Sequence, residues 1–144
     1  MDGWFCRQSE LIEVRRSAAR GRGGRGVYAL RDIAAGTVIE RVPVLLIPRN
    51  QVFSDDPKVP SPSPQISWYV FDWTGHTKRD YVALALGYGS IYNHADDPNA
   101  AWEPEPPDTL AFRATRPIAA GEEVFISYRG KGDDPHPLGF EPKG

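Results

Sequence analysis

The sequence predicts a mainly β fold built from many short strands and at most one or two short helices. Short segments rich in β-branched and aromatic residues recur along the chain, and such segments are typical of strands. Fourteen glycines and fourteen prolines separate these segments with turns. Strand-like segments do not alternate with helical ones, which argues against a parallel sheet covered by helices.

The length of 144 residues predicts one domain, residues 1–144, with its core in about residues 11–129. Hydrophobic residues make up 40% of the chain and aromatic residues 11%. Both fractions exceed what a disordered segment carries. The chain is therefore expected to fold around a single modest core, with much irregular backbone.

The first third of the chain is expected to form strands around two loops. Residues 11–14 predict a short strand, and the basic, glycine-rich segment RRSAARGRGGRG at 15–26 predicts a loop. Residues 27–33 resume a strand pattern. In the segment at 32–48, β-branched residues flank a turn at Ala35–Gly36, and two prolines interrupt the strands.

The middle of the chain begins with an insertion loop at about residues 49–66, rich in Asp, Ser and Pro. Residues 66–73 are aromatic and strand-prone. Residues 80–86, DYVALAL, are expected to form about two helical turns that end at Gly87 and Gly89.

The last third predicts two strands joined by a turn, within residues 109–128. A polar tail follows at 130–144, and Leu138 and Phe140 are its large apolar residues. The segment PIAAGEEVF within the predicted strands resembles the earlier DIAAGTVIE. A single echo is not a repeat array, so we interpret it as shared turn chemistry.

Composition and charge exclude several classes of function. Seventeen basic and nineteen acidic residues give a net charge of -2, so the chain as a whole does not attract nucleic acid or an anionic membrane. No apolar run approaches the roughly 18 residues that span a bilayer, and the N-terminal segment lacks the apolar core of a signal peptide. These features predict a cytoplasmic protein and leave a nuclear or host-nuclear location open.

Cysteine and histidine are too few to predict a metal centre. Cys6 is the single cysteine, so no internal disulfide is possible. The chain has three histidines, which are His76, His94 and His136. A zinc site would then need unusual help from carboxylates, and we expect no structural metal.

The segment GRGGRG at 21–26 has the spacing of a dinucleotide-binding loop. In that fold the glycines follow a buried strand and open a helix, whereas here arginines surround them and β-prone residues follow. An RNA contact and a flexible hairpin loop are two further interpretations. The fourth is a backbone cradle for a small cofactor, which needs glycine because no Cβ atom then separates the chain from its ligand.

The segment NHADDPN at 93–99 and the tyrosine that ends GEEVFISY at 121–128 each have a plain and a functional interpretation. The density of Asn, Asp and Pro favours a turn, and His94 with the two aspartates is a weak candidate metal site. An Asn amide has both donors and acceptors, which suits an amino-acid-like ligand. Tyr128 is either a strand-end aromatic or a hydroxyl at the rim of an apolar channel, where it orients an amine and accepts C–H hydrogen bonds from a polarised methyl group.

The order and spacing of these segments are more specific than any one of them. Together they resemble the SET domain family of protein lysine methyltransferases, over nearly the whole chain. The matching elements are a G-x-G loop, an N-H-x-x-x-P-N stretch and a GEE-x-x-x-x-Y stretch, found here at Gly24–Gly26, at Asn93, His94, Pro98 and Asn99, and at Gly121–Tyr128. The sequence is similar to minimal, stand-alone members, because the cysteine-rich flanking segments of many chromatin-acting members are absent.

The resemblance implies a SET fold of the β-clip type, with short strands in small sheets. It also implies a pseudoknot that brings His94 and Tyr128 into one site. The implied cofactor is S-adenosyl-L-methionine, and no metal is implied. The residues expected to bind this cofactor are Gly24, Arg25, Gly26, Val27, Tyr28, Asn93, His94 and Tyr128.

The same resemblance makes Tyr128 the catalytic residue. An apolar channel for the target lysine needs aromatic walls, and the candidates are Trp102, Tyr81 and Tyr92. The tail around Leu138–Phe140 is the segment available to close over this channel. The chain departs from the family pattern at Ala95, where many members have serine, and at Ser90–Tyr92, where an arginine and an aromatic residue are common.

The predicted function is S-adenosylmethionine-dependent methyl transfer to a lysine side chain of a protein substrate. The expected partner is a histone tail or another basic protein, with no nucleic acid or membrane partner, and a homodimer is possible. Two alternatives remain open at this point. One is an inactive peptide-binding module of the same fold, and the other is an RNA-binding β domain that uses the basic loop.

Overall fold

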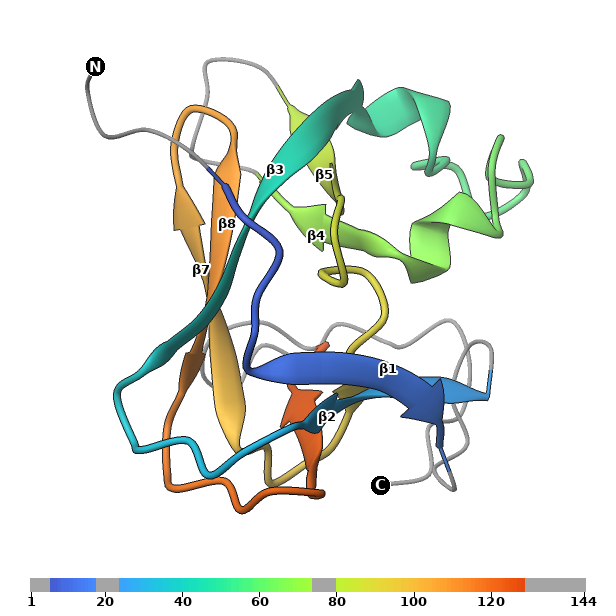
Figure 1. Cartoon of the computed structure of the whole chain (residues 1–144). Coiled ribbons are helices and arrows are strands. Elements are labelled where there is room, and N and C mark those ends of the chain that lie inside the picture. The colour runs from blue at the N-terminus through green and yellow to red at the C-terminus, as the bar shows by residue number, and fades with distance from the viewer. Residues whose placement is uncertain (1–5, 18–23, 74–79, 129–144) are drawn as a thin grey trace.

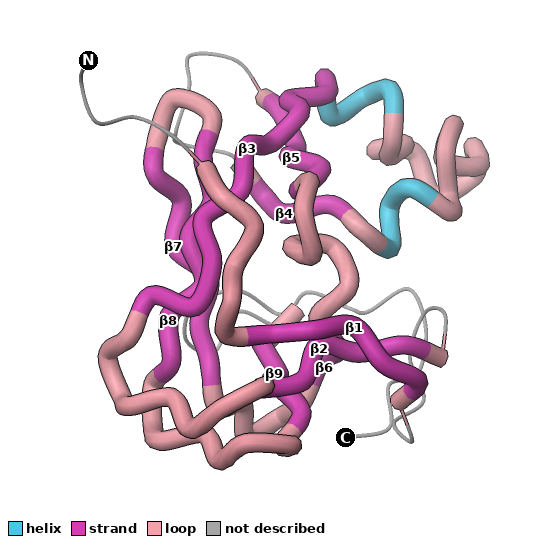
Figure 2. The backbone as a smooth tube through the Cα atoms, in the orientation of Figure 1, coloured by secondary structure: helices cyan, strands magenta, loops and turns pink. Residues whose placement is uncertain are grey.

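The computed structural model describes residues 6–17, 24–73 and 80–128. Strands dominate this part of the chain (Figure 1; Figure 2), which confirms the prediction of a mainly β fold. Its elements are β1 (Ile12–Arg16), β2 (Arg25–Ala29), β3 (Val38–Pro48), η1 (Arg49–Gln51), η2 (Ile66–Trp68), β4 (Val70–Asp72), β5 (Tyr81–Ala85), β6 (Asn93–His94), β7 (Ala100–Glu105), β8 (Thr109–Ala114) and β9 (Glu123–Ile126).

These strands form two small sheets, with the orders β1-β2-β9-β6 and β4-β5-β3-β8-β7. Neighbouring strands are antiparallel except β6 and β9, which run parallel. The long strand β3 pairs with β8 along its first part and with β5 along its second part. In Figure 1 the first sheet lies across the lower part of the molecule, and β3 rises from it toward η1.

One cluster of buried apolar side chains contains residues from both sheets. Val27 and Val124 come from the first sheet, Leu110 and Phe112 come from the second, and all four have an exposed fraction of 0%. Burial of each such side chain stabilises the fold by about 1.5–3 kcal/mol. The two sheets therefore share one core, and the residues at their junction are fixed by packing from both sides.

The two AAG turns have the same backbone and contact each other. Gly36 has a φ of 86° and Gly121 a φ of 87°, the left-handed region that favours glycine. Just before these turns, Ile33 and Ile118 exchange two backbone hydrogen bonds, with N···O distances of 2.8 and 2.9 Å. The interpretation of the echo as shared turn chemistry is confirmed.

The prediction of a helix at residues 80–86 is wrong. Residues Tyr81–Ala85 form β5, which pairs with β3 on one side and with β4 on the other. Alanine and leucine favour a helix locally, but two ladders of backbone hydrogen bonds outweigh that preference. The short helices are instead the single-turn η1 and η2, at the two ends of the insertion loop.

Candidate active site

Strands β6 and β9 bring the two predicted motifs together. They pair in parallel, with Asn93 opposite Phe125 and His94 opposite Ile126. Just beyond β9, the backbone N–H of Tyr128 donates to Nδ1 of His94 at 3.0 Å. The rings of His94 and Tyr128 lie 5.2 Å apart between centroids. His94 and Tyr128 are thus in contact, as expected from the resemblance.

Asn99 holds these two segments in place. Its Nδ2 donates to the backbone carbonyl of Glu123 at 2.9 Å, and its Oδ1 accepts the backbone N–H of Phe125 at 2.8 Å. One carboxamide thereby satisfies both a donor and an acceptor of the β9 backbone, which few other side chains can do. Asn99 matches the family motif, but no role was predicted for it, although an amide can bond both a donor and an acceptor of a strand backbone.

The hydrogen bonds of His94 define its tautomer. Its side chain has an exposed fraction of 2%, and its Nε2 lies 2.9 Å from Oδ1 of Asp96. Because Nδ1 accepts the Tyr128 N–H, it carries no proton, and the neutral ring donates through Nε2 to the carboxylate. The histidine is therefore a fixed structural link between the motifs, with both nitrogens engaged.

Asn93, in β6, is 3% exposed, and its side chain contacts both β2 and β9. Its Nδ2 donates to the backbone carbonyl of Arg25 and to Oε2 of Glu123, each at 2.7 Å. Both neighbours are acceptors, so the nitrogen must face them, and the acceptor Oδ1 points elsewhere. Glu123 also accepts the hydroxyl of Ser17 at 2.6 Å. The carboxylate of Glu123 therefore joins β9 to β6 and to Ser17, the residue that follows β1.

Gly26 lies directly against this cluster. A Cβ atom on Gly26 would lie 2.1 Å from Oε2 of Glu123 and 3.0 Å from Nδ2 of Asn93. Close approach to a cofactor stays a prediction for this glycine, and these contacts add close approach to two protein side chains. Gly24, with a φ of 67°, turns the chain into β2.

The remaining predicted loop residues belong to β2 and so do not open a helix. Val27 is fully buried in the core. Tyr28 lies half-buried under the guanidinium of Arg15, whose Cζ is 5.1 Å from the ring centroid, and burial raises the pKa of its hydroxyl. The backbone carbonyl of Arg25 lies beside the Asn93 side chain. Because a strand and not a helix follows the glycines, the interpretation as a dinucleotide-binding loop is excluded.

Tyr128 is held at both its backbone and its hydroxyl. The hydroxyl donates to the backbone carbonyl of Tyr92 at 2.6 Å. Trp102 is close by, since its indole N–H donates to the carbonyl of Ser127 at 3.1 Å. The Trp102 ring also packs edge-on against Phe71, with 5.1 Å between centroids. Of the three proposed channel aromatics, Trp102 is therefore the one whose side chain lies beside the segment that ends in Tyr128.

The side chain of Tyr92 is not exposed to any channel. It is 0% exposed, its ring stacks on Phe112 at 4.3 Å, and its hydroxyl donates to Oε1 of Glu40 at 2.8 Å. The prediction that its ring lines a channel is corrected, because the side chain points into the core. Its contribution to the site is the backbone carbonyl that accepts Tyr128.

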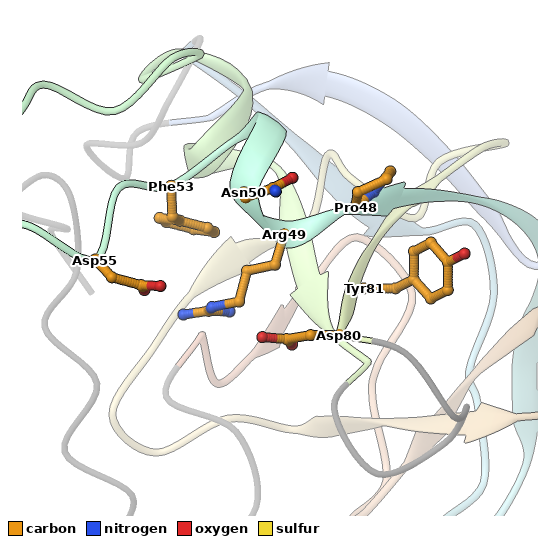
Figure 3. Close-up of a pocket in the computed structure, with 7 residues that line it drawn as sticks. All are labelled: Pro48, Arg49, Asn50, Phe53, Asp55, Asp80 and Tyr81. Carbon is orange, nitrogen blue, oxygen red and sulfur yellow. The ribbon is translucent and has the colours of Figure 1, made fainter.

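Tyr81 does not lie beside Tyr128. It lines a cavity of about 310 Å³ at the C-terminal end of β3. The lining residues are Pro48, Arg49, Asn50, Phe53, Asp55, Asp80 and Tyr81. Figure 3 shows the Arg49 side chain extending between Asp55 and Asp80, and its Cζ lies 4.7 Å from the Phe53 ring centroid. In Figure 1 this end of β3 is far from β1 and β2, so Tyr81 is separate from the His94 and Tyr128 cluster.

His94 and its two neighbouring aspartates, the weak candidate metal site, do not converge on one point. Asp96 bonds His94, while Asp97 pairs with Arg116 at 3.0 Å. Within residues 6–17, 24–73 and 80–128, no group of three or more His, Cys, Asp or Glu side chains is arranged to hold a metal ion. In the same part of the chain, no helix is long and apolar enough to cross a membrane.

The sequence model of the SET domain matches residues 24–129. The chain belongs to the SET domain family. A curated relative from Schizosaccharomyces pombe, the histone-lysine N-methyltransferase specific for H3 lysine-37, is 32% identical over 108 residues, which are 74% of this chain and 67% of the relative. A solved structure of a candidate histone methyltransferase from Plasmodium falciparum superposes with a TM-score of 0.63 at 26% identity, covering 88% of this chain and 97% of that one.

The SET domain match begins at Gly24 and so includes every residue predicted for the site. The structure brings three of its segments into one cluster, namely β2, β6 and the end of β9 with Tyr128. The tail predicted to close over the channel, with Leu138 and Phe140, lies outside the described residues.

Proposed function

We propose that this SET domain is a protein-lysine methyltransferase that uses S-adenosyl-L-methionine, with Tyr128 as its catalytic residue. Lysine methyltransferase activity is supported by the family match and by the curated relative. The observation that carries the catalytic assignment is the double anchoring of Tyr128, at its N–H by His94 and at its hydroxyl by the carbonyl of Tyr92.

The three segments expected to hold the cofactor converge in one place, which fits the binding of a small ligand. The Arg25 carbonyl is bonded to the Asn93 side chain, and β6 lies directly beside β9. Asn93 presents its Oδ1 as an acceptor. When bound, S-adenosylmethionine supplies an electrophilic methyl group on a positively charged sulfur.

Tyr128 then has a defined task. Its hydroxyl proton is donated to the Tyr92 carbonyl, so toward any other group this oxygen acts as an acceptor. Such an oxygen orients a lysine amine and accepts C–H hydrogen bonds from a polarised methyl group. Its position is set by the β6 and β9 pairing, so this orientation is largely arranged before the substrate arrives.

The lysine must lose a proton before it can react. A free lysine has a pKa of about 10.4, so about one molecule in a thousand is neutral near pH 7.4. An apolar environment beside a sulfonium lowers the pKa of the amine, and no strong base is needed. Trp102, which is half-buried beside Ser127, supplies apolar surface next to Tyr128 for this purpose.

The proposed substrate is a histone tail or another basic protein. The curated relative acts on histone H3, and the similar Plasmodium structure is that of a candidate histone methyltransferase. An alternative is an inactive module of the same fold that binds a peptide without transferring a methyl group. The presence of Tyr128, Asn93 and His94 favours an active enzyme, because an inactive relative would be free to lose them.

The decisive experiment compares the wild-type protein with Tyr128→Phe, using labelled S-adenosylmethionine with core histones and a cell lysate. We expect turnover to fall by roughly 10²-fold, since one preorganised polar group is removed from the site. Cofactor affinity, measured by calorimetry, should stay within about twofold because the phenylalanine ring keeps the packing. Unchanged turnover would refute the assignment of Tyr128.

The other functions give different results in the same assays. A protein that binds the cofactor and yields no methyllysine by mass spectrometry is the inactive module. A protein that fails to bind S-adenosylmethionine is not a methyltransferase of this kind.

A further inference from the structure

A β-bulge in β3 turns the side chain of Glu40 into the core. The pairing of β3 with β8 changes register between Val38 and Glu40. As a result Ile39 and Glu40 are both buried, at 2% and 5% exposure, and the alternation of inward and outward side chains is broken. Bulges of this type re-aim a side chain and recur next to functional sites.

Inside the core, Glu40 binds both ends of the turn that leads into β6. Its Oε2 accepts the backbone N–H of Tyr88 at 3.1 Å, and its Oε1 accepts the hydroxyl of Tyr92 at 2.8 Å. The turn approaches so closely that a Cβ atom on Gly87 would lie 3.0 Å from Oε2 of Glu40. The positive φ of Gly87, 58°, is a second reason for glycine here.

Tyr92 connects this carboxylate to the catalytic tyrosine. The Tyr92 hydroxyl binds Glu40, while the Tyr92 carbonyl accepts the hydroxyl of Tyr128 at 2.6 Å. The ring between these two groups is stacked on Phe112 and fully buried. A displacement at Glu40 would therefore move the acceptor that orients Tyr128.

Stability alone is a poor reason for a carboxylate at this position. Removing a carboxylate from water costs several kcal/mol, and an apolar side chain of similar volume is often neutral or stabilising in its place. Burial accordingly raises the pKa of the Glu40 carboxyl, although its hydrogen bonds from Tyr88 and Tyr92 act in the opposite direction. Compared with an apolar side chain of similar volume, the carboxylate is expected to be the less stabilising group, yet it fixes a turn of the site.

We propose that Glu40 is a positioning residue that fixes the Tyr92 carbonyl and thereby the orientation of the Tyr128 hydroxyl. This inference rests on the catalytic role proposed for Tyr128. Glu40 acts through Tyr92 and does not touch the reacting groups.

The test uses protein labelled with ¹³C at the tyrosine ζ carbon, because this shift reports the hydrogen bond of each hydroxyl. The Tyr128 resonance is the one lost in Tyr128→Phe. We expect Glu40→Gln and Tyr92→Phe each to shift this resonance, because each alters the contact between Glu40 and Tyr92. Two control variants should leave it in place: Tyr88→Phe, whose hydroxyl instead accepts a bond from Gln8 at 3.3 Å, and Glu10→Gln, an exposed carboxylate.

Kinetics with core histones form the second part of the test. We expect Glu40→Gln to lower kcat by roughly tenfold with the KM for S-adenosylmethionine nearly unchanged, since small misplacement of a reacting group slows chemistry more than binding. In the double variant with Tyr92→Phe, the two losses should not add, because both act on one contact.

The outcomes are distinguishable. A folded Glu40→Gln protein with an unshifted Tyr128 resonance overturns the inference, whatever its activity. If Glu40→Gln fails to fold, Tyr92→Phe decides in the same way. A shifted resonance in a protein whose wild type methylates nothing supports the positional link, while the proposed function itself fails.

Discussion

Two carboxylates follow the two AAG turns, and the comparison between them shows how similar local sequences acquire different roles. Glu40 lies in β3, after the turn at Gly36, and Glu123 lies in β9, after the turn at Gly121. They bind consecutive residues of one segment, since Glu40 accepts from Tyr92 and Glu123 accepts from Asn93. The segment that enters β6 is thus held from both sides.

The two turns themselves are nearly equivalent. The N–H of Gly36 donates to the carbonyl of Ala114, and the N–H of Gly121 donates to the carbonyl of Ala29, each at 2.8 Å. Each turn therefore binds the strand that precedes the other. The difference arises afterwards. Glu40 lies four residues beyond Gly36, where the bulge in β3 sends it inward, whereas Glu123 lies two residues beyond Gly121 and stays half-buried.

The largest expected contrast is between Glu40→Ala and Glu123→Ala. Removal of Glu40 takes an acceptor from the part-buried N–H of Tyr88 and from the buried hydroxyl of Tyr92, and the loss of an acceptor for a buried donor costs about 1–3 kcal/mol. We expect Glu40→Ala to lower the free energy of unfolding by roughly 2–4 kcal/mol. Glu123→Ala should cost about 1 kcal/mol, because the Asn93 side chain keeps the Arg25 carbonyl as an acceptor and Ser17 is only half-buried.

Urea unfolding, with the slope m checked for constancy, measures both losses. Equal losses in the two variants would show that burial does not separate the two carboxylates.

An intermediate effect is expected from Gly36→Ala and Gly121→Ala. No heavy atom beyond the chain neighbours lies within 4 Å of a Cβ atom built at either glycine. The cost is therefore the left-handed backbone alone, about 1–2 kcal/mol at each site. Thermal or urea unfolding should give equal losses for the two variants, and a clear inequality would contradict the equivalence of the turns.

The smallest expected effect is a pH dependence of the unfolding free energy that comes from the Glu40 carboxyl. Burial raises the pKa of Glu40 in the folded state, so the folded protein retains a proton that the unfolded chain has already released. This contribution to stability is complete below the ordinary glutamate pKa of about 4.3 and is lost as pH rises through the folded value.

The difference in unfolding free energy between the wild type and Glu40→Gln should therefore change against the wild type as the pH rises above the ordinary glutamate pKa of about 4.3. The other carboxylates titrate in both proteins and cancel. A difference that stays constant, or that moves in favour of the wild type, would contradict the raised pKa.

Much of the site was predictable because its residues carry their chemistry in the sequence. The order of the glycine loop, NHADDPN and GEEVFISY identified the family, and His94 and Tyr128 meet as expected. Glycine in the AAG turns was predictable for a local reason, since few other residues adopt a positive φ.

The predictions that were wrong failed because the deciding neighbours are distant in sequence. Residues 80–86 form a strand because β3 and β4 flank them, and Tyr92 turns its ring inward because Glu40 and Phe112 lie there. Neither neighbour is near in sequence. Tyr81 was grouped with the site by its residue type, although it opens β5 at the far end of β3.

The sequence by itself determined the turns, the strand-rich character and the motifs, because these depend on backbone preferences and side-chain chemistry within a few residues. Only the tertiary structure decided which side chains share a site. A bulge in one strand, a parallel pair of two residues and a buried carboxylate join segments about fifty residues apart, such as Glu40 and Tyr92. Contacts of this kind are set by packing of the whole core, and a local pattern cannot encode them.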